Sequence, residues 1–127
     1  MSLIVQIGKN CVIAAQVGIA GSTVLENNVT LAGQVGIVGH ITIGAGSVVA
    51  AKSAVFQSLG PDSFVSGIPA RDHKNRMRQD VVVHQLPAIL NRILKIEKEL
   101  PISEENKFVP EISDYTPHIS PLLGHIK

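Results

Sequence analysis

The sequence has few aromatic residues, one cysteine and no long apolar run. Only 3% of its 127 residues are aromatic, although 45% are hydrophobic, so aliphatic side chains must form its core. The single cysteine, Cys11, excludes an intrachain disulfide and a cysteine-based metal cluster. A net charge of +1 provides no field that would attract nucleic acid or a membrane surface. We expect a cytoplasmic protein with a thin aliphatic core, no signal peptide and no transmembrane segment.

Aliphatic residues recur at every sixth position. Most positions four residues further on are small or β-branched, and the Gly, Ala and Asn between them suit turns with positive φ. A six-residue period is typical of hexapeptide repeats, whose short strands direct aliphatic side chains into one core. We expect the whole aliphatic series to be buried. It consists of Ile7, Ile13, Ile19, Leu25, Leu31, Ile37, Ile43, Val49 and Val55.

A longer period is superimposed on the hexads. The run Ala14–Gly21 recurs 18 residues later as Ala32–Gly39, so three hexads make one coil. Coils of this kind resemble the left-handed parallel β-helix, an exception to the right-handed crossover rule. The predicted fold class is therefore all-β with an α appendage, with about three coils and nearly one-dimensional stability. Ile19→Asp should be severely destabilising, because it places an unpaired charge inside a narrow prism.

The hexad pattern is interrupted at Gly60-Pro61-Asp62, and the apolar spacing further along the chain becomes helical. Pro87 suits the first turn of a helix better than a helix interior. The sequence therefore predicts two helices rather than one. The predicted segments are a β-helix over 1–60, a connecting loop and C-terminal helices over 61–100, with helices near 71–84 and 86–100, and an irregular proline-containing tail over 101–127.

The paired Gln-Val-Gly-Ile blocks are more specific than a generic hexapeptide pattern. The run Ile13–Thr23, its echo Gly33–His40 and the segment Ser66–Ala70 resemble the UDP-3-O-acylglucosamine N-acyltransferases of lipid A biosynthesis. The resemblance covers residues 4 to about 100. It implies transfer of a 3-hydroxyacyl group from acyl carrier protein to the 2-amine of UDP-3-O-acyl-glucosamine. It also implies a homotrimer that needs no cofactor and no metal.

Two features of that family have no counterpart in this sequence. Family members carry an N-terminal uridine-binding domain, followed by an Ala-His-Asn-Val stretch just before the Ile-Gly that corresponds to Ile7-Gly8. Counting back places the general-base histidine at Leu3 and the asparagine at Ile4, and neither residue can do that chemistry. We interpret the chain as a truncated fragment, with an inactive relative as the alternative. Either way, we expect little or no transferase activity.

The 18-residue coil places position 3, Gly21 and Gly39 in one column, with neighbouring strands about 4.8 Å apart. The resemblance implies that the Gly21 N–H stabilises the oxyanion and that His40 hydrogen-bonds substrate or the acyl hydroxyl. Without the resemblance, Gly21 is a turn residue and His40 an exposed corner histidine. Because His40 is the only histidine in the coils, they cannot form a three-histidine metal site.

Other residues have both a binding and a structural interpretation. Ala54 and Phe56 match positions near the family's acyl groove, although packing on the last coil explains them equally well. Gln16 and Gln34, one coil apart, are interpreted as a ladder of side-chain amides. A basic group where the chain leaves the coils would attract acidic acyl carrier protein, or would simply be a solvated helix face. Its members are Arg71, Lys74, Arg76 and Arg78.

Two other classes of function stay open. One is a hexapeptide sugar acetyltransferase that uses acetyl-CoA, against which the helical appendage argues, because a free CoA donor needs no protein-docking element. The other is a non-enzymatic trimeric β-helical scaffold, which the missing histidine at position 3 favours.

Overall fold

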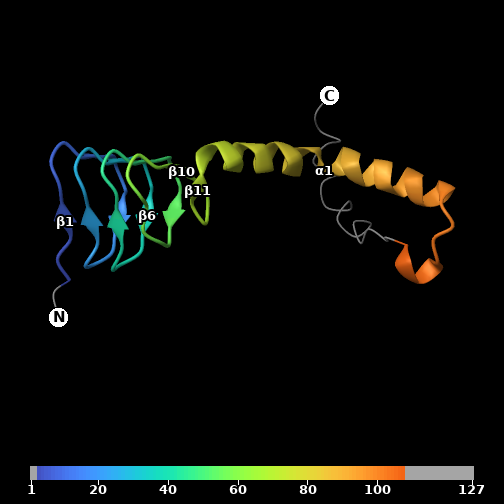
Figure 1. Cartoon of the computed structure of the whole chain (residues 1–127), viewed down its shortest axis with the longest axis horizontal. Coiled ribbons are helices and arrows are strands. Elements are labelled where there is room, and N and C mark those ends of the chain that lie inside the picture. The colour runs from blue at the N-terminus through green and yellow to red at the C-terminus, as the bar shows by residue number, and fades with distance from the viewer. Residues whose placement is uncertain (1–2, 108–127) are drawn as a thin grey trace, which may run out of the picture. The chain divides into compact units, whose positions relative to one another are not determined.

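The structure, a computed structural model, describes residues 3–107. The chain divides into two compact units, with the boundary between His84 and Gln85. The first unit contains all of the strands described here, which stack from the blue N-terminal coil to the green coil in Figure 1. They are β1 Gln6–Ile7, β2 Val12–Ile13, β3 Gly18–Ile19, β4 Val24–Leu25, β5 Thr30–Leu31, β6 Gly36–Ile37, β7 Thr42–Ile43, β8 Val48–Val49, β9 Ala54–Val55, β10 Phe64–Ser66 and β11 Arg71–Asp72.

The strands form three parallel faces, and each coil adds to the faces in turn. One face is β1-β4-β7, a second is β3-β6-β9, and the third is β2-β5-β8-β10, to which β11 adds in antiparallel orientation. Ile7 pairs with Leu25, and Leu25 pairs with Ile43, so the register advances by 18 residues per coil. This arrangement is a parallel β-solenoid of about three turns, which confirms the fold predicted from the hexads.

The corners of the solenoid use left-handed backbone conformations. Non-glycine residues recur at these corners with φ between 55° and 63°, a region that L-residues other than Asn and Asp seldom adopt. A hydrogen bond between coils supports the corners, for example from the His40 N–H to the Gly21 carbonyl at 3.2 Å. At another corner the amide of Gln34 donates to the Gln16 side chain at 2.6 Å, which confirms the predicted amide ladder. The corner residues are Asn10, Gln16, Ser22, Asn28, Gln34, His40, Lys52 and Asp62.

The aliphatic series is buried in the second and third coils only. Six of its members, from Leu25 to Val55, are at most 3% exposed. In the first coil, Ile7 is 52% and Ile13 is 39% exposed, and Ile19 is half-buried. The prediction that all nine positions are buried is therefore wrong for the first coil. The reason is that β1, β2 and β3 are terminal strands among the described residues, so no further strand covers them.

The last coil is two residues shorter than the others. Leu59 bridges to Ile43, and Phe64 pairs with Val48, each 16 residues along the chain instead of 18. The shortening falls between Val55 and Leu59, and it lets Val65 reach the core at 5% exposure. Strand pairing thus continues past residue 60, where the sequence predicted the end of the β-helix. The prediction placed the end too early because the shortened hexad interrupts the six-residue pattern in the sequence, although the solenoid continues.

A single helix follows the solenoid. The helix α1 spans His73–Glu99 with Pro87 inside it, so the predicted pair of helices is wrong. Proline has a helix-compatible φ and removes only one N–H donor, and the chain continues through it. The helix begins at His73 because the Asp72 carboxylate accepts a hydrogen bond from the Asn75 N–H at 3.0 Å. A short 3-10 helix, η1, covers Glu104–Asn106.

No residue of α1 is buried. Of the helices in residues 3–107, none has the length and hydrophobicity that crossing a membrane requires. The predicted tail lies mostly outside the described residues.

Candidate functional site

The column predicted from the 18-residue period exists in the structure. A Cβ placed on Gly21 would lie 3.0 Å from the Leu3 Cβ, and one placed on Gly39 would lie 2.7 Å from the Gly21 carbonyl oxygen. The coils that carry Gly21 and Gly39 are therefore so close together that any side chain at Gly39 would collide with the backbone. The Leu3 side chain is 71% exposed, so the position that corresponds to the family's base is accessible to solvent.

His40 follows this column directly. Its backbone has φ +62°, and its N–H is the donor to the Gly21 carbonyl described above. The imidazole is exposed. The structure thus brings Gly21 and His40 together through the backbone of adjacent coils, and leaves the ring accessible to a ligand.

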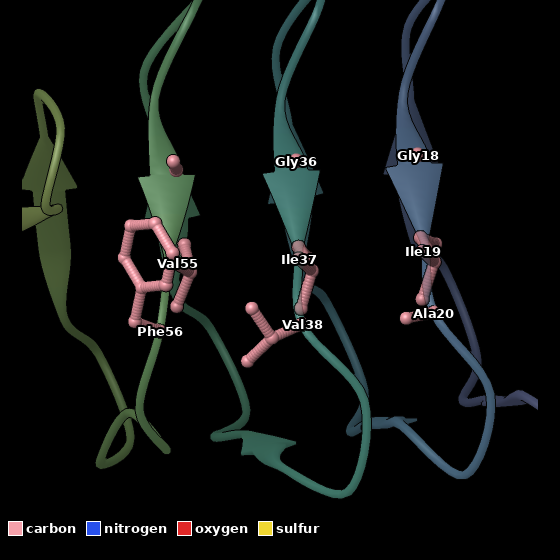
Figure 2. A pocket seen from close by; sticks show the side chains of 9 residues that line it. Gly18, Ile19, Ala20, Gly36, Ile37, Val38, Val55 and Phe56 are labelled. Carbon is pink, nitrogen blue, oxygen red and sulfur yellow. The ribbon is translucent and has the colours of Figure 1, made fainter.

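A shallow apolar groove of about 530 Å³ runs across the face formed by β3, β6 and β9. Figure 2 shows that Ala20, Val38 and Phe56 come from successive coils, so side-chain size increases toward Phe56. Gly18 and Gly36 occupy the strands beside them, and a Cβ on either glycine would meet nothing within 4 Å. Packing within this chain therefore does not require glycine at these two positions. Their effect is to leave room on the outer surface of the face.

The sequence-predicted acyl-groove residues both line this groove. Ala54 is half-buried in β9, and its backbone is held by hydrogen bonds to Gly67 and Ala70. Phe56 is 56% exposed, so its ring does not pack into the core of this chain. Because Ala20 and Val38 directly precede Gly21 and Gly39, the groove and the glycine column are adjacent along the same coils.

The basic group predicted from the sequence divides into two pairs. Arg71 donates to the Ala70 carbonyl at 3.0 Å, and Arg76 lies 3.4 Å from the Asp80 carboxylate and packs over Gly67. Lys74 and Arg78 instead lie one helical turn apart and border an exposed apolar surface on α1. This surface, which we call the helix patch, consists of His73, Lys74, Met77, Arg78, Val81 and Val82.

Sequence reasoning missed the contact that joins the last coil to α1. The His73 ring stacks on Phe64 with centroids 4.1 Å apart, and its Nδ1 lies 2.9 Å from the hydroxyl of the buried Ser66. This contact depends on the shortened coil, which places β10 beside the start of the helix. Regular hexad spacing therefore contains no signal for it. The contact orients the helix patch relative to the last coil.

Hexads that form three-sided coils define the class of hexapeptide-repeat proteins. No protein-family model matches the chain. Curated proteins named UDP-3-O-acylglucosamine N-acyltransferase match parts of it, and two of them serve as examples. The one from Methylobacterium sp. (strain 4-46) is 44% identical over 84 residues, which cover 66% of this chain and 24% of that protein. The one from Thermosynechococcus vestitus is 49% identical over 94 residues, which cover 74% and 28%.

Over the matched residues the chain is thus a relative of the UDP-3-O-acylglucosamine N-acyltransferases, as its repeat blocks predicted. The chain spans about a quarter of the length of these relatives. Among solved structures, a hexapeptide-repeat acetyltransferase from Vibrio cholerae O1 biovar eltor, complexed with acetyl coenzyme A, is similar with a TM-score of 0.45 and 26% identity. That similarity covers 54% of this chain and 58% of the other.

Proposed function

We propose that this chain is part of an acyltransferase of lipid A biosynthesis, with a 3-hydroxyacyl group as the group transferred. The donor is acyl carrier protein, and the acceptor is the 2-amine of UDP-3-O-acyl-glucosamine. The observation that carries the proposal is the apolar groove beside the Gly21 column, because its two glycines leave space that packing within the chain does not need. An acyl chain in that space would place its thioester carbonyl near the column.

The chemistry assigns a role to each part of the column. The neutral amine attacks the thioester carbonyl carbon, a C–N bond forms, and the C–S bond breaks to release the carrier thiol. The Gly21 N–H is the proposed donor to the oxyanion, and a preorganised donor there strongly stabilises the developing charge. The exposed imidazole of His40 is the proposed partner of the acyl hydroxyl. Ala54 and Phe56 are the proposed contacts of the acyl chain. Neither a cofactor nor a metal is needed for this reaction.

Leu3 occupies the position where the resemblance places the general base. A leucine cannot accept the amine proton, and general-base help is typically worth about 10²–10⁴-fold in rate. We therefore propose that the chain of 127 residues has little or no activity by itself.

The helix patch is the proposed docking surface for acyl carrier protein. Lys74 and Arg78 would meet acidic side chains, while Met77 and Val81 would contact apolar ones. Arg71 and Arg76 already have partners within the chain, so we assign them a smaller part in docking. The free thiol of Cys11 suits a reducing compartment, and we propose the cytoplasm. We also propose a homotrimer, because three coils bury little core and sites between adjacent prisms suit closed cyclic symmetry.

The test is an acyl-transfer assay with 3-hydroxyacyl carrier protein and the UDP-sugar acceptor. Three proteins are compared: the chain itself, its Leu3→His variant, and a chimera in which the upstream segment of the Thermosynechococcus vestitus relative precedes Ile4. The chimera should be the most active, and Leu3→His should exceed a matched Leu3→Phe control. If the chain is as fast as the chimera, the base does not lie at position 3. If the chimera turns over only acetyl-CoA, or nothing, the proposed function is wrong.

The groove has a separate test in the active chimera. Gly36→Leu adds a side chain into open space, so it should leave the fold intact but block the acyl chain. Thr30→Leu changes the corresponding strand position on another face and is the matched control. Loss of transfer in Gly36→Leu alone supports the groove, whereas equal activity of the two variants contradicts it.

A further inference from the structure

One strand of the solenoid is anchored by a side-chain hydroxyl instead of a backbone carbonyl. In the other strands from β1 to β9, the first N–H donates to a backbone carbonyl further along the chain, as that of Val24 does to Ile41 at 3.0 Å. The first N–H of β7 belongs to Thr42, and its acceptor is the Ser58 hydroxyl at 3.0 Å. The side chain of Ser58 therefore supplies the acceptor that the backbone supplies in the other strands.

This exception falls in the shortened part of the last coil. Ser58 lies between Val55 and Leu59, where two residues fewer than in a regular coil connect the strands. The Leu59 N–H donates to the Thr42 carbonyl at 2.9 Å, so Ser58 and Leu59 hold the Thr42 backbone at its N–H and at its carbonyl. A serine side chain thus completes the contact between coils where the backbone is shortened.

The residue held in this way lies two positions after His40, at the same corner of the solenoid. His40 has φ +62°, a conformation that persists in a non-glycine residue only where surrounding contacts hold it. Its N–H reaches the Gly21 carbonyl at 3.2 Å, whereas the equivalent bonds at the other corners measure between 2.8 and 3.0 Å. Because this bond is the longest of the set, the His40 corner depends more than the others on its second anchor, the bond from Thr42 to Ser58.

We propose that Ser58 is a positioning residue for His40. Its hydroxyl fixes the backbone at Thr42 and thereby sets the direction of the exposed His40 ring. The inference rests on the proposed function for what the ring does, which is to hydrogen-bond the acyl hydroxyl. Hydrogen bonds weaken steeply when they are misaligned, so a displaced ring would lose that partner. Ser58 would then influence the choice between hydroxylated and unsubstituted acyl donors through His40.

The first experiment measures donor selectivity in the active chimera. The quantity is the ratio of kcat/KM for 3-hydroxyacyl carrier protein to kcat/KM for the unsubstituted acyl carrier protein of the same chain length. Ser58→Ala should lower this ratio by about ten-fold, the effect of losing one aligned hydrogen bond. Ser58→Thr keeps a hydroxyl and should retain the ratio. An unchanged ratio in an active Ser58→Ala chimera would overturn the proposal.

Two controls separate positioning from general loosening of the last coil. Ser63→Ala removes an exposed hydroxyl that donates to the Gly60 carbonyl at 2.6 Å, at another corner of the same coil, and should leave the ratio unchanged. In a His40→Ala background, Ser58→Ala should lower the ratio no further, because its effect acts through the ring. A full effect of Ser58→Ala without His40 would mean that Ser58 does not act through this histidine.

The second experiment needs no acyl transfer and uses the chain itself. Nuclear magnetic resonance follows the ring signals of His40, assigned by their loss in His40→Ala, and the hydrogen exchange of the Thr42 amide. Ser58→Ala should shift the ring signals and speed the exchange, whereas Ser63→Ala should change neither, and circular dichroism checks that both variants stay folded. Unmoved ring signals in Ser58→Ala, or an equal shift in Ser63→Ala, would refute positioning. If the chimera transfers no acyl group, the proposed function fails, and the ring signals still decide whether Ser58 positions His40.

Discussion

The first coil and the two coils that follow have the same hexad pattern but very different burial. In the column of β1, β4 and β7, exposure falls from 52% at Ile7 to 1% at Leu25 and 0% at Ile43. All three residues are aliphatic, and all belong to paired parallel strands in one register. The difference therefore teaches that the pattern decides which way a side chain points, while a stacked neighbour decides whether water is excluded from it.

This difference has a large energetic consequence. Full burial of an aliphatic side chain of this size contributes about 1.5–3 kcal/mol, and an exposed one contributes little. In a solenoid, each coil gains most of its stability from its neighbours. The inner coils should therefore carry most of the free energy of unfolding, and equivalent changes in the first coil should matter less.

The largest expected effect comes from a charge placed in the core. Ile37→Asp should abolish folding, because an unpaired buried carboxylate costs more than about 4 kcal/mol in a small domain. Ile7→Asp should leave a folded chain, and the half-buried Ile19→Asp should fall between them, which revises the severe effect expected from the pattern alone. Circular dichroism and urea unfolding measure all three. If Ile7→Asp unfolds the chain as fully as Ile37→Asp, the first coil is covered in solution.

Truncation of aliphatic side chains should also destabilise the chain more in the inner coils than in the first coil, but by smaller amounts than a charge does. Ile43→Ala removes a fully buried side chain and should lower the free energy of unfolding by about 2–5 kcal/mol. Ile7→Ala, in the same column, should cost less than about 1 kcal/mol, as surface changes do. Urea titrations give both values. Similar losses in the two variants would contradict one-dimensional stacking.

A buried hydroxyl should contribute less to the free energy of unfolding than a buried aliphatic side chain does. The Ser47 hydroxyl donates to the Gly60 carbonyl at 3.1 Å and accepts from the Ser63 N–H at 3.3 Å, and the residue is 0% exposed. Ser47→Ala should therefore destabilise the chain by about 1–3 kcal/mol, because the Ser63 N–H loses its partner and the Gly60 carbonyl keeps only the Ser63 hydroxyl as a donor. Cys11→Ala is the control in the equivalent position of the first coil, where the half-buried thiol is a weak donor to the Glu26 carbonyl at 3.1 Å. A larger loss in Cys11→Ala would refute this ranking.

The smallest expected effect concerns the amide ladder between the first and second coils. Gln34→Ala should cost about 0.5–1.5 kcal/mol at most, since it removes one exposed hydrogen bond to Gln16. A double-mutant cycle with Gln16→Ala isolates the pair and should give a small favourable coupling energy. A coupling near zero would mean that the ladder does not hold the first coil on the second.

The sequence predicted some parts of the candidate site better than others. The column of position 3, Gly21 and Gly39 follows from an 18-residue repeat alone, and the structure places Leu3 and Gly39 against Gly21 as expected. The groove was foreseen only at Ala54 and Phe56, because the open space beside Gly18 and Gly36 becomes visible when adjacent coils are in place. The division of the basic group was predictable only in part: the pair of Arg76 and Asp80 follows from i,i+4 helix spacing, but Arg76 packs over Gly67 only once the last coil has formed.

The sequence by itself determined the features that depend on local periodicity. Six-residue spacing sets which residues point inward, and the 18-residue echo sets which residues stack. Only the tertiary structure decided which inward residues are buried, where the last coil shortens between Val55 and Leu59, and that one helix runs through Pro87. The physical reason is that periodicity is a property of neighbouring residues in the chain. Burial and strand register depend on contacts between residues a whole coil apart.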